Sequence, residues 1–302
     1  MPDSVLSYHS DKMTASLKNT EKTLVGEIDF SIMQGEKLAL IGETGSGKTL
    51  TALSIMGLLP QNVECKGLRI KLQCKGGRTH VGPDVFRTAG SAVVYIPQNG
   101  LESLNPRRKV RAHLYDTLRK NGYDKLAVAQ KALEMLKLAG FESPEDIIDL
   151  YPFQLSGGMA QRVTIALAMT GRESLIIADE PTNGLDQVGR DNFLRLLDSR
   201  FPEAAKLVIT HDMAVAALTD KVIVLKNGIV MEQGPSDLVL ERPGCQYTKA
   251  LMDALVGNGM KETPRLRDPD SCCPFYSRCS KACSSCFSVS NRKDGEHVWR
   301  CI

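Results

Sequence analysis

Apolar residues form several short continuous runs in this chain, and helical patterns separate the runs. The runs, at residues 37–41, 92–96, 175–178 and 207–210, predict strands that are buried on both faces of a sheet. Segments with a helical pattern lie between them. Strands that alternate with helices in this way predict an α/β fold whose core sheet is mostly parallel.

The two ends of this predicted core carry weaker strand signals. Residues 1–36 read as short strands and turns, with apolar and polar positions alternating at residues 28–32. Near residue 222, a short apolar run, a Lys-Asn-Gly turn and residues 229–231 predict a hairpin. A helical stretch follows to about residue 256.

A helical insertion interrupts the alternating pattern from about residue 107. Its spacing is clearest in five apolar residues, Leu126, Ala129, Leu133, Leu136 and Ala139. We therefore expect a helical subdomain at about residues 107–170 within one domain of residues 1–256. Because residues 257–271 have the composition of a linker, we expect residues 257–302 to form a linker and a cysteine-rich tail.

Composition places the chain among ordinary globular proteins. Of its 302 residues, 42% are hydrophobic and 24% are charged, and its net charge of +3 argues neither for nor against nucleic acid as a partner. No apolar run reaches the ~18 residues that span a bilayer, and residues 1–20 lack the apolar centre of a signal peptide. We expect a cytoplasmic protein, which would reach a membrane only by docking on other subunits.

Cysteines are concentrated towards the C-terminal end, where six of the nine lie between residues 272 and 301. In a reducing compartment, such crowding favours a metal site over disulfides. Groups of four thiolates suit iron–sulfur clusters and zinc alike, so the residues by themselves leave the metal open.

The first apolar run leads into a glycine loop that fits the phosphate-binding pattern G-x-x-x-x-G-K-[ST]. The loop stands between a predicted strand and a predicted helix, which is the context that the pattern needs. Glycines let backbone N–H groups turn towards phosphate oxygens, Lys48 would reach the β- and γ-phosphates, and the Thr49 hydroxyl would bind Mg²⁺. The candidate nucleotide-binding residues are Gly42, Glu43, Thr44, Gly45, Ser46, Gly47, Lys48 and Thr49.

Two acidic residues end the buried strand at residues 175–178. Ligands of parallel sheets bind where strands end, so Asp179 is a candidate ligand of Mg²⁺. Glu180 beside it is a candidate general base for an attacking water. Together with the glycine loop, these acids predict a site that binds and cleaves a nucleoside triphosphate.

The order of these residues resembles the ATP-binding-cassette (ABC) ATPases over about residues 5–256. Four further motifs occur in the order along the sequence that they have in ABC ATPases: Gln98, the turn Leu155-Ser156-Gly157-Gly158, the segment 184–186 and His211. The resemblance implies a P-loop NTPase fold with an N-terminal antiparallel β subdomain. It also implies Mg²⁺-dependent ATP hydrolysis by two subunits paired head to tail, in which the second glycine turn of each subunit completes the ATP site of the other.

The same resemblance implies roles for individual residues. His211 would contact the γ-phosphate and Glu180, and Gln98 would bind Mg²⁺ and sense the attacking water. Asp186 would lie near the junction of the two subunits, and Tyr8 would stack on adenine. The residues that would contact the ATP of the partner subunit are Ser156, Gly157, Gly158 and Gln161.

Three further segments, residues 103–106, 151–154 and 246–251, resemble the ABC importers of oligopeptides, dipeptides and nickel. This implies a peripheral subunit on the cytoplasmic side of the plasma (inner) membrane. Its partners would be a second ATPase subunit, identical or paralogous, two permeases and, indirectly, a solute-binding protein, with no nucleic acid. The alternative is a soluble ABC ATPase that acts in DNA repair or translation.

The tail of that importer branch carries cysteines that are proposed to hold a [4Fe-4S] cluster. In this chain the matching residues are Cys273, Cys279, Cys286 and Cys301. The resemblance therefore implies an iron–sulfur cluster as a cofactor in addition to ATP and Mg²⁺, and Zn²⁺ is the alternative metal.

Overall fold

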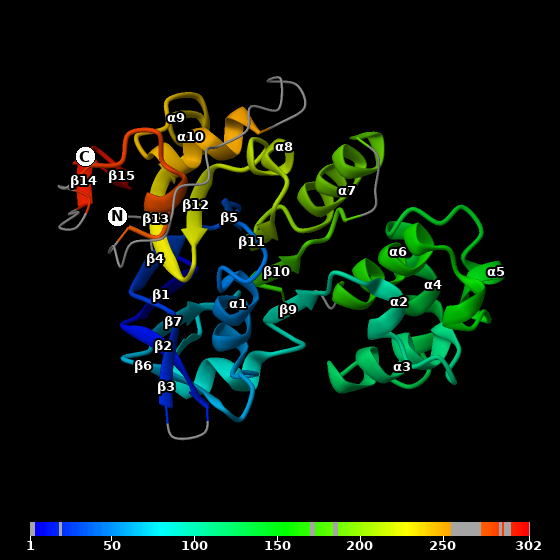
Figure 1. Cartoon of the computed structure of the whole chain (residues 1–302). Helices are drawn as coiled ribbons and strands as arrows, with labels where there is room; N and C mark the ends of the chain where they lie inside the picture. Colours follow the sequence, from blue (N-terminus) through cyan, green and yellow to red (C-terminus); the bar gives the residue numbers. More distant parts are fainter. Residues whose placement is uncertain are drawn as a thin grey trace. The chain divides into compact units, whose positions relative to one another are not determined.

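The computed structural model describes residues 4–17, 20–169, 173–183, 187–254, 273–283, 286 and 291–301. The chain forms two compact units, and Figure 1 labels most of their helices and strands. The first unit comprises residues 1–6, 32–35 and 71–207, and the second comprises residues 7–31, 36–70 and 208–302. The strands that carry the chain from one unit into the other are β1 (Leu6–Ser10), β4 (Ile28–Ile32), β7 (Arg69–Gln73) and β11 (Ala205–Thr210).

The second unit is built on two parallel strands, β5 (Lys37–Gly42) and β12 (Lys221–Lys226). Both strands are buried over most of their length, which explains their apolar sequence. β12 turns back into β13 (Ile229–Pro235), and the predicted hairpin is confirmed. Asn227 and Gly228 take the positive φ angles, 47° and 78°, that such a tight turn requires.

The cysteine-rich tail contributes two strands that the apolar pattern does not predict. β14 (Asn291–Asp294) and β15 (His297–Arg300) form an antiparallel pair, and β15 pairs with β13. Figure 1 shows this pair in red beside the yellow β13. The tail also joins the core of the second unit, because Phe275 and Cys279 are buried against its apolar residues.

The remaining elements of the second unit surround this sheet. Its helices α9 and α10 pack on β13, and α1 and α8 pack on β5. A separate antiparallel sheet has the order β3-β2-β6. The bounds of these elements, and of the short helix η4 of the tail, are β2 (Lys12–Leu17), β3 (Thr20–Val25), α1 (Lys48–Met56), β6 (Val63–Lys66), α8 (Met213–Ala216), α9 (Ser236–Glu241), α10 (Gln246–Asp253) and η4 (Tyr276–Arg278).

The first unit combines two parallel strands with a group of helices. β9 (Val93–Ile96) pairs with β10 (Leu175–Asp179), and every residue of β10 is buried. Helices α2 to α6 pack on one another, and α6 also packs on β9. The other bounds are β8 (Thr79–Val81), η1 (Gly82–Thr88), α2 (Gly100–Ser103), α3 (Val110–Lys120), α4 (Val128–Leu138), α5 (Pro144–Ile148), η2 (Pro152–Gln154), α6 (Gly157–Ala168) and α7 (Gln187–Arg200).

The α/β fold class predicted from the sequence is confirmed, and the sheet is mixed, with parallel and antiparallel pairs. Antiparallel pairs enter through the β12–β13 hairpin and the tail strands. The predicted linker at 257–271 and the segment 184–186, with Asp186, lie outside the described residues. In the described parts of the chain, no helix is long and apolar enough to cross a membrane.

Candidate functional site

The glycine loop of the second unit connects β5 to α1, as its sequence predicts. Two of its glycines have no room for a side chain. A Cβ atom on Gly42 would lie 2.1 Å from the Leu225 carbonyl oxygen, and one on Gly47 would lie 2.4 Å from Cγ2 of Val25. Both residues also have positive φ angles, 150° and 100°. The loop is therefore a tight structure that its neighbours enclose.

The loop presents the groups that an anion needs. The Lys48 ammonium is buried and donates hydrogen bonds to the carbonyl oxygens of Gly42 at 2.8 Å and Glu43 at 3.1 Å. Helix α1 begins at Lys48, and no side chain of the described residues caps its N-terminus. The buried Ser46 hydroxyl has no hydrogen-bond partner among the described residues. An uncapped helix start, a lysine and an unsatisfied hydroxyl together fit a phosphate group.

Two cations beside the loop were not singled out from the sequence. Lys226 makes an ion pair with one carboxylate oxygen of Glu43 at 2.5 Å, and Arg278 pairs with the other at 3.3 Å. In addition, the Gly228 amide donates to the carbonyl oxygen of Ser46 at 3.1 Å. Lys226 is the last residue of the buried strand β12, which ends at the same sheet edge as the loop, and this position is the one sequence signal that points to it.

Asp179 lies in the first unit, at the end of β10, and is buried. Its carboxylate accepts a hydrogen bond from the Tyr95 hydroxyl at 3.0 Å. Burial and this neighbouring carboxylate raise the pKa of Tyr95, so the hydroxyl remains a donor over the physiological range. A buried carboxylate that a protein donor orients can act as a metal ligand.

Glu180 and Gln98 follow the two strands of the first unit. Glu180 has a φ of 46°, an uncommon value for a residue other than glycine, and its carbonyl oxygen accepts from the Asn183 amide at 3.1 Å. Strained backbone of this kind is concentrated at functional sites. Gln98 is exposed two residues beyond β9. The structure places both in the first unit with Asp179, and the glycine loop in the second.

The second glycine turn starts helix α6 of the first unit. The Ser156 hydroxyl caps this helix by accepting a hydrogen bond from the Met159 amide at 3.3 Å. Gly157 and Gly158 are exposed, and a Cβ atom on either would meet none of the described atoms within 4 Å. Gln161 is buried one turn further along the helix. The turn thus offers an accessible helix N-terminus.

His211 is exposed in the second unit, directly after β11. Its neighbour Asp212 caps α8 by accepting a hydrogen bond from the Ala214 amide at 2.9 Å. Tyr8, in contrast, is fully buried, stacks on Phe30 with 5.0 Å between ring centroids, and shares a hydrogen bond of 2.7 Å with Ser54. This burial corrects the expectation that Tyr8 stacks on adenine, because no face of its ring is open to a ligand.

Four cysteines of the tail, together with one of the core, line a small cavity of the second unit, of about 40 Å³. Burial raises the pKa of the thiols of Cys273, Cys279 and Cys286, so a metal would have to displace their protons. In the described chain, no three His, Cys, Asp or Glu residues are grouped so that they could hold a metal ion. The cysteines that line the cavity are Cys245, Cys273, Cys279, Cys286 and Cys301.

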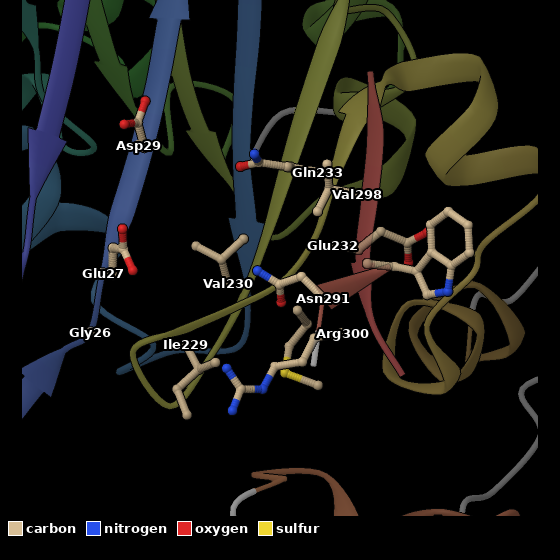
Figure 2. A pocket seen from close by; sticks show the side chains of 12 residues that line it. Gly26, Glu27, Asp29, Ile229, Val230, Glu232, Gln233, Asn291, Val298 and Arg300 are labelled. Atoms are coloured by element: carbon tan, nitrogen blue, oxygen red, sulfur yellow. The ribbon is translucent and has the colours of Figure 1, made fainter. Parts of the chain in front are cut away.

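A larger cavity, of about 380 Å³, lies in the second unit where the tail strands meet β13. Figure 2 shows Asn291, Val298 and Arg300 of the tail near Val230 and Gln233 of β13. The Nε atom of Arg300 is buried and has no hydrogen-bond partner among the described residues. The cavity marks the seam along which the tail docks on the sheet.

Comparisons with known proteins agree with this geometry. The family model described as "ABC transporter" matches residues 25–183, and the model "Oligopeptide/dipeptide transporter, C-terminal region" matches residues 231–286. A solved structure of the ATP-binding cassette MJ0796 bound to ADP and Pi aligns with a TM-score of 0.63 at 24% identity, over 76% of this chain and 98% of that one. At this identity the likeness shows the fold alone.

Curated relatives are similar over most of the chain. The dipeptide transport ATP-binding protein DppD of Haemophilus influenzae is 38% identical over 79% of this chain and 73% of its own. The oligopeptide transport ATP-binding protein AppD of Bacillus subtilis is 36% identical over 92% of this chain and 90% of its own. The metal-staphylopine import system ATP-binding protein CntD of Staphylococcus aureus is 33% identical over 77% of this chain and 87% of its own.

Proposed function

Because the chain belongs to the ABC transporter family, as an ATPase of the oligopeptide/dipeptide importer type, we propose that it energises the uptake of a peptide or of a nickel or metal chelate. The names of DppD and AppD favour peptides, and that of CntD favours a metal chelate. The match of the C-terminal region to peptide transporters favours an importer over a soluble ABC ATPase of DNA repair or translation.

The phosphate loop is the observation that carries the proposal. Its enclosed glycines, the buried Lys48 and the unsatisfied Ser46 hydroxyl fit the phosphates of ATP. Thr49 and Asp179 would hold Mg²⁺, with Gln98 as a further ligand. When bound, the metal would neutralise charge that develops on the phosphate oxygens.

Two residues would act on the water that attacks the γ-phosphate. The Glu180 carboxylate would accept the proton of this water, and His211 would keep the γ-phosphate and that carboxylate in place. The Lys48 ammonium would exchange its present bonds to loop carbonyls for bonds to phosphate oxygens. These roles follow from the family and from the chemistry of the side chains.

We propose that two ATPase subunits pair so that the turn at Ser156, Gly157 and Gly158 of one subunit, together with Gln161, contacts the ATP of the other. Asp186 would lie near the junction of the two subunits. The exposed start of α6 supports this, since a helix N-terminus attracts phosphate. The partner subunit is identical or paralogous. Two permeases and, through them, a solute-binding protein complete the importer, and the chain is peripheral on the cytoplasmic side of the membrane.

A single substitution tests the paired site. Gly158→Glu adds a negative charge at an open position in the first turn of α6, where an acidic residue suits the helix dipole, so the fold should persist. ATP binding to the loop of the same chain should persist as well, and ATP hydrolysis should be lost. Gln130→Glu, on the exposed face of α4, is the matched control. Undiminished hydrolysis by Gly158→Glu would contradict the pairing.

Co-purification tests the transport role separately. In mild detergent, the tagged chain should bring down two membrane permeases, and a soluble ABC ATPase would not. Isolation with DNA-repair or ribosomal proteins in place of permeases would support the alternative function.

We further propose that Cys273, Cys279, Cys286 and Cys301 hold a metal group, a [4Fe-4S] cluster or else Zn²⁺. The shared cavity supports this proposal, while the present spacing of the thiols does not by itself form a metal site. Protein purified without oxygen should be brown and contain iron, and Cys273→Ser should lose the colour. A colourless protein with bound zinc would favour the zinc site. A protein with neither metal would refute both.

A further inference from the structure

Glu43 of the phosphate loop connects the loop to two cations that lie far away in the sequence. One carboxylate oxygen pairs with Lys226 at 2.5 Å and the other pairs with Arg278 at 3.3 Å. Glu43 and Arg278 are about two-fifths exposed, whereas only 8% of the Lys226 side chain is exposed. The carboxylate is therefore shared between a buried lysine of the core and an accessible arginine of the tail.

The register of the sheet explains the position of Lys226. Leu225 of β12 lies opposite Gly42 of β5, so the residues that come next in the sequence, Lys226 and Glu43, emerge at the same edge of the sheet. A buried ammonium group needs a partner of opposite charge. Lys226 also lies over the Tyr247 ring, with 5.2 Å between Nζ and the ring centroid.

The tail places Arg278 beside the same carboxylate. Arg278 ends the short helix η4, between the buried residues Phe275 and Cys279. The Phe275 ring contacts the ring of Tyr247, with 5.3 Å between centroids. The packing that docks the tail on the core therefore fixes the backbone from which the guanidinium reaches Glu43.

The backbone of Glu43 takes part in the phosphate loop itself. Its carbonyl oxygen accepts a hydrogen bond from Lys48 Nζ at 3.1 Å and another from the Ser46 amide at 3.2 Å. A side chain that is held at both oxygens limits the rotation of this peptide, so the ion pairs help to hold the loop in the form that receives phosphate. They also neutralise a carboxylate that would otherwise repel phosphate.

We infer that Arg278 is a positioning residue of the phosphate loop, through which the cysteine-lined tail acts on the affinity for ATP. The inference rests on the proposed binding of ATP at this loop. Arg278 does not touch the reacting atoms. Its loss should weaken ATP binding and leave the turnover at saturating ATP nearly unchanged.

The test measures the affinity for Mg·ATP by calorimetric titration in a hydrolysis-deficient Glu180→Gln background. It compares Arg278→Ala and Arg278→Lys with the same background in which Arg278 is unchanged. Arg278→Ala should bind ATP about three- to fivefold more weakly, the range of an accessible ion pair, and Arg278→Lys should recover most of the affinity. In the hydrolysis-competent protein, KM should rise by a similar factor while kcat stays within about twofold. Arg292→Ala, at an exposed arginine of β14, is the control with unchanged affinity.

Two further comparisons separate this role from a general effect on folding. The difference between wild type and Arg278→Ala should shrink at high salt, because salt screens an accessible ion pair. In a Glu43→Gln background, Arg278→Ala should have little additional effect. Equal ATP affinity of Arg278→Ala and the wild type, or an undiminished effect in the Glu43→Gln background, would overturn the inference. Failure of the wild type to bind ATP would instead refute the proposed function.

Discussion

The Tyr95 hydroxyl donates a hydrogen bond to the Asp179 carboxylate across the two parallel strands of the first unit, over 3.0 Å. Tyr95 lies opposite Ile177 in the register of β9 and β10, so it stands beside the end of β10 at which Asp179 emerges. A buried carboxylate has few orientations, and this donor selects among them. We therefore regard Tyr95 as a residue that positions the proposed Mg²⁺ ligand.

The first prediction concerns this bond. Tyr95→Phe removes the donor and keeps the ring, so Asp179 should be held less firmly. Loss of a hydrogen bond to a metal ligand commonly costs about tenfold or more in metal affinity or activity. We expect the Mg²⁺ concentration for half-maximal ATPase activity to rise by about tenfold. Tyr115→Phe, on α3, is the control, and an unchanged Mg²⁺ requirement in Tyr95→Phe would contradict the role.

Local patterns predict the buried strands of this chain well. β10 is buried at every position, so its sequence shows an unbroken apolar run, and β4 alternates between buried and exposed residues as its sequence does. β14 has the sequence Asn-Arg-Lys-Asp, with all four residues exposed, and is a strand only because it pairs with β15. A pattern of apolar residues carries no information about such a strand.

The contacts around the site were harder to predict for a related reason. Glu43 is separated from Lys226 by 183 residues and from Arg278 by 235. These contacts depend on strand register and on the docking of the tail, neither of which local spacing specifies. The same holds for Tyr8, whose burial against Phe30 and Ser54 results from tertiary packing.

The second prediction compares two glycines of the phosphate loop. Gly42→Ala places a Cβ atom 2.1 Å from the backbone oxygen of Leu225, so β5 and β12 would have to separate. Gly45 has a φ of 81°, and a Cβ atom there would meet no described atom within 4 Å. We expect Gly42→Ala to abolish ATP binding. Gly45→Ala should lower the free energy of unfolding by about 1 kcal/mol, which is the strain of a left-handed residue other than glycine.

Equilibrium ATP binding and chemical unfolding of both variants check this prediction. If Gly45→Ala were as damaging as Gly42→Ala, the loop would be sensitive to backbone strain alone, and the enclosure by Leu225 would not be the cause.

The third prediction concerns the proposed general base. Glu180→Gln keeps the size of the side chain and removes its ability to accept a proton, so ATP should bind while hydrolysis falls by at least about 100-fold. ATP that is bound but not hydrolysed should keep the subunits paired, and size-exclusion chromatography in the presence of ATP would detect the dimer. Glu145→Gln, at an exposed residue of α5, is the control. Persisting hydrolysis in Glu180→Gln would assign the base to another residue.

The fourth prediction is a dependence of stability on pH. Hydrogen bonds to the carboxylates of Asp11 and Asp29, each 2.9 Å long, raise the pKa of His9 above its ordinary value of 6.5. The folded chain therefore binds the proton more tightly than the unfolded chain. This stabilisation is fully present below about pH 6.5 and is lost as the pH rises through the higher pKa of the folded state.

Urea unfolding at several pH values checks this sign. His9→Gln should flatten the decline in stability above pH 6.5. His113 offers a contrast, because burial lowers its pKa, so its contribution should increase as the pH rises towards 6.5. A decline that is the same with and without His9 would assign the titration to another group.

The last prediction concerns the attachment of the tail. The fully buried Glu232 of β13 bonds to His297 of the tail at 2.6 Å and accepts hydrogen bonds from the backbone amides of Gly244 and Cys245. Glu232→Ala removes the hydrogen-bond partner of the His297 ring and of these two backbone amides. Removal of one partner of a buried pair costs about 3–5 kcal/mol, so the free energy of unfolding should fall by about 3 kcal/mol. Limited proteolysis should also release the tail sooner.

Gln233→Ala, at the next residue of β13, is the matched control, and it should lower the free energy of unfolding by less than about 1 kcal/mol. Equal effects of the two substitutions would show that the Glu232–His297 pair does not attach the tail. If Glu232→Ala releases the tail, it should also weaken ATP binding as Arg278→Ala does, since the guanidinium that pairs with Glu43 would leave with it.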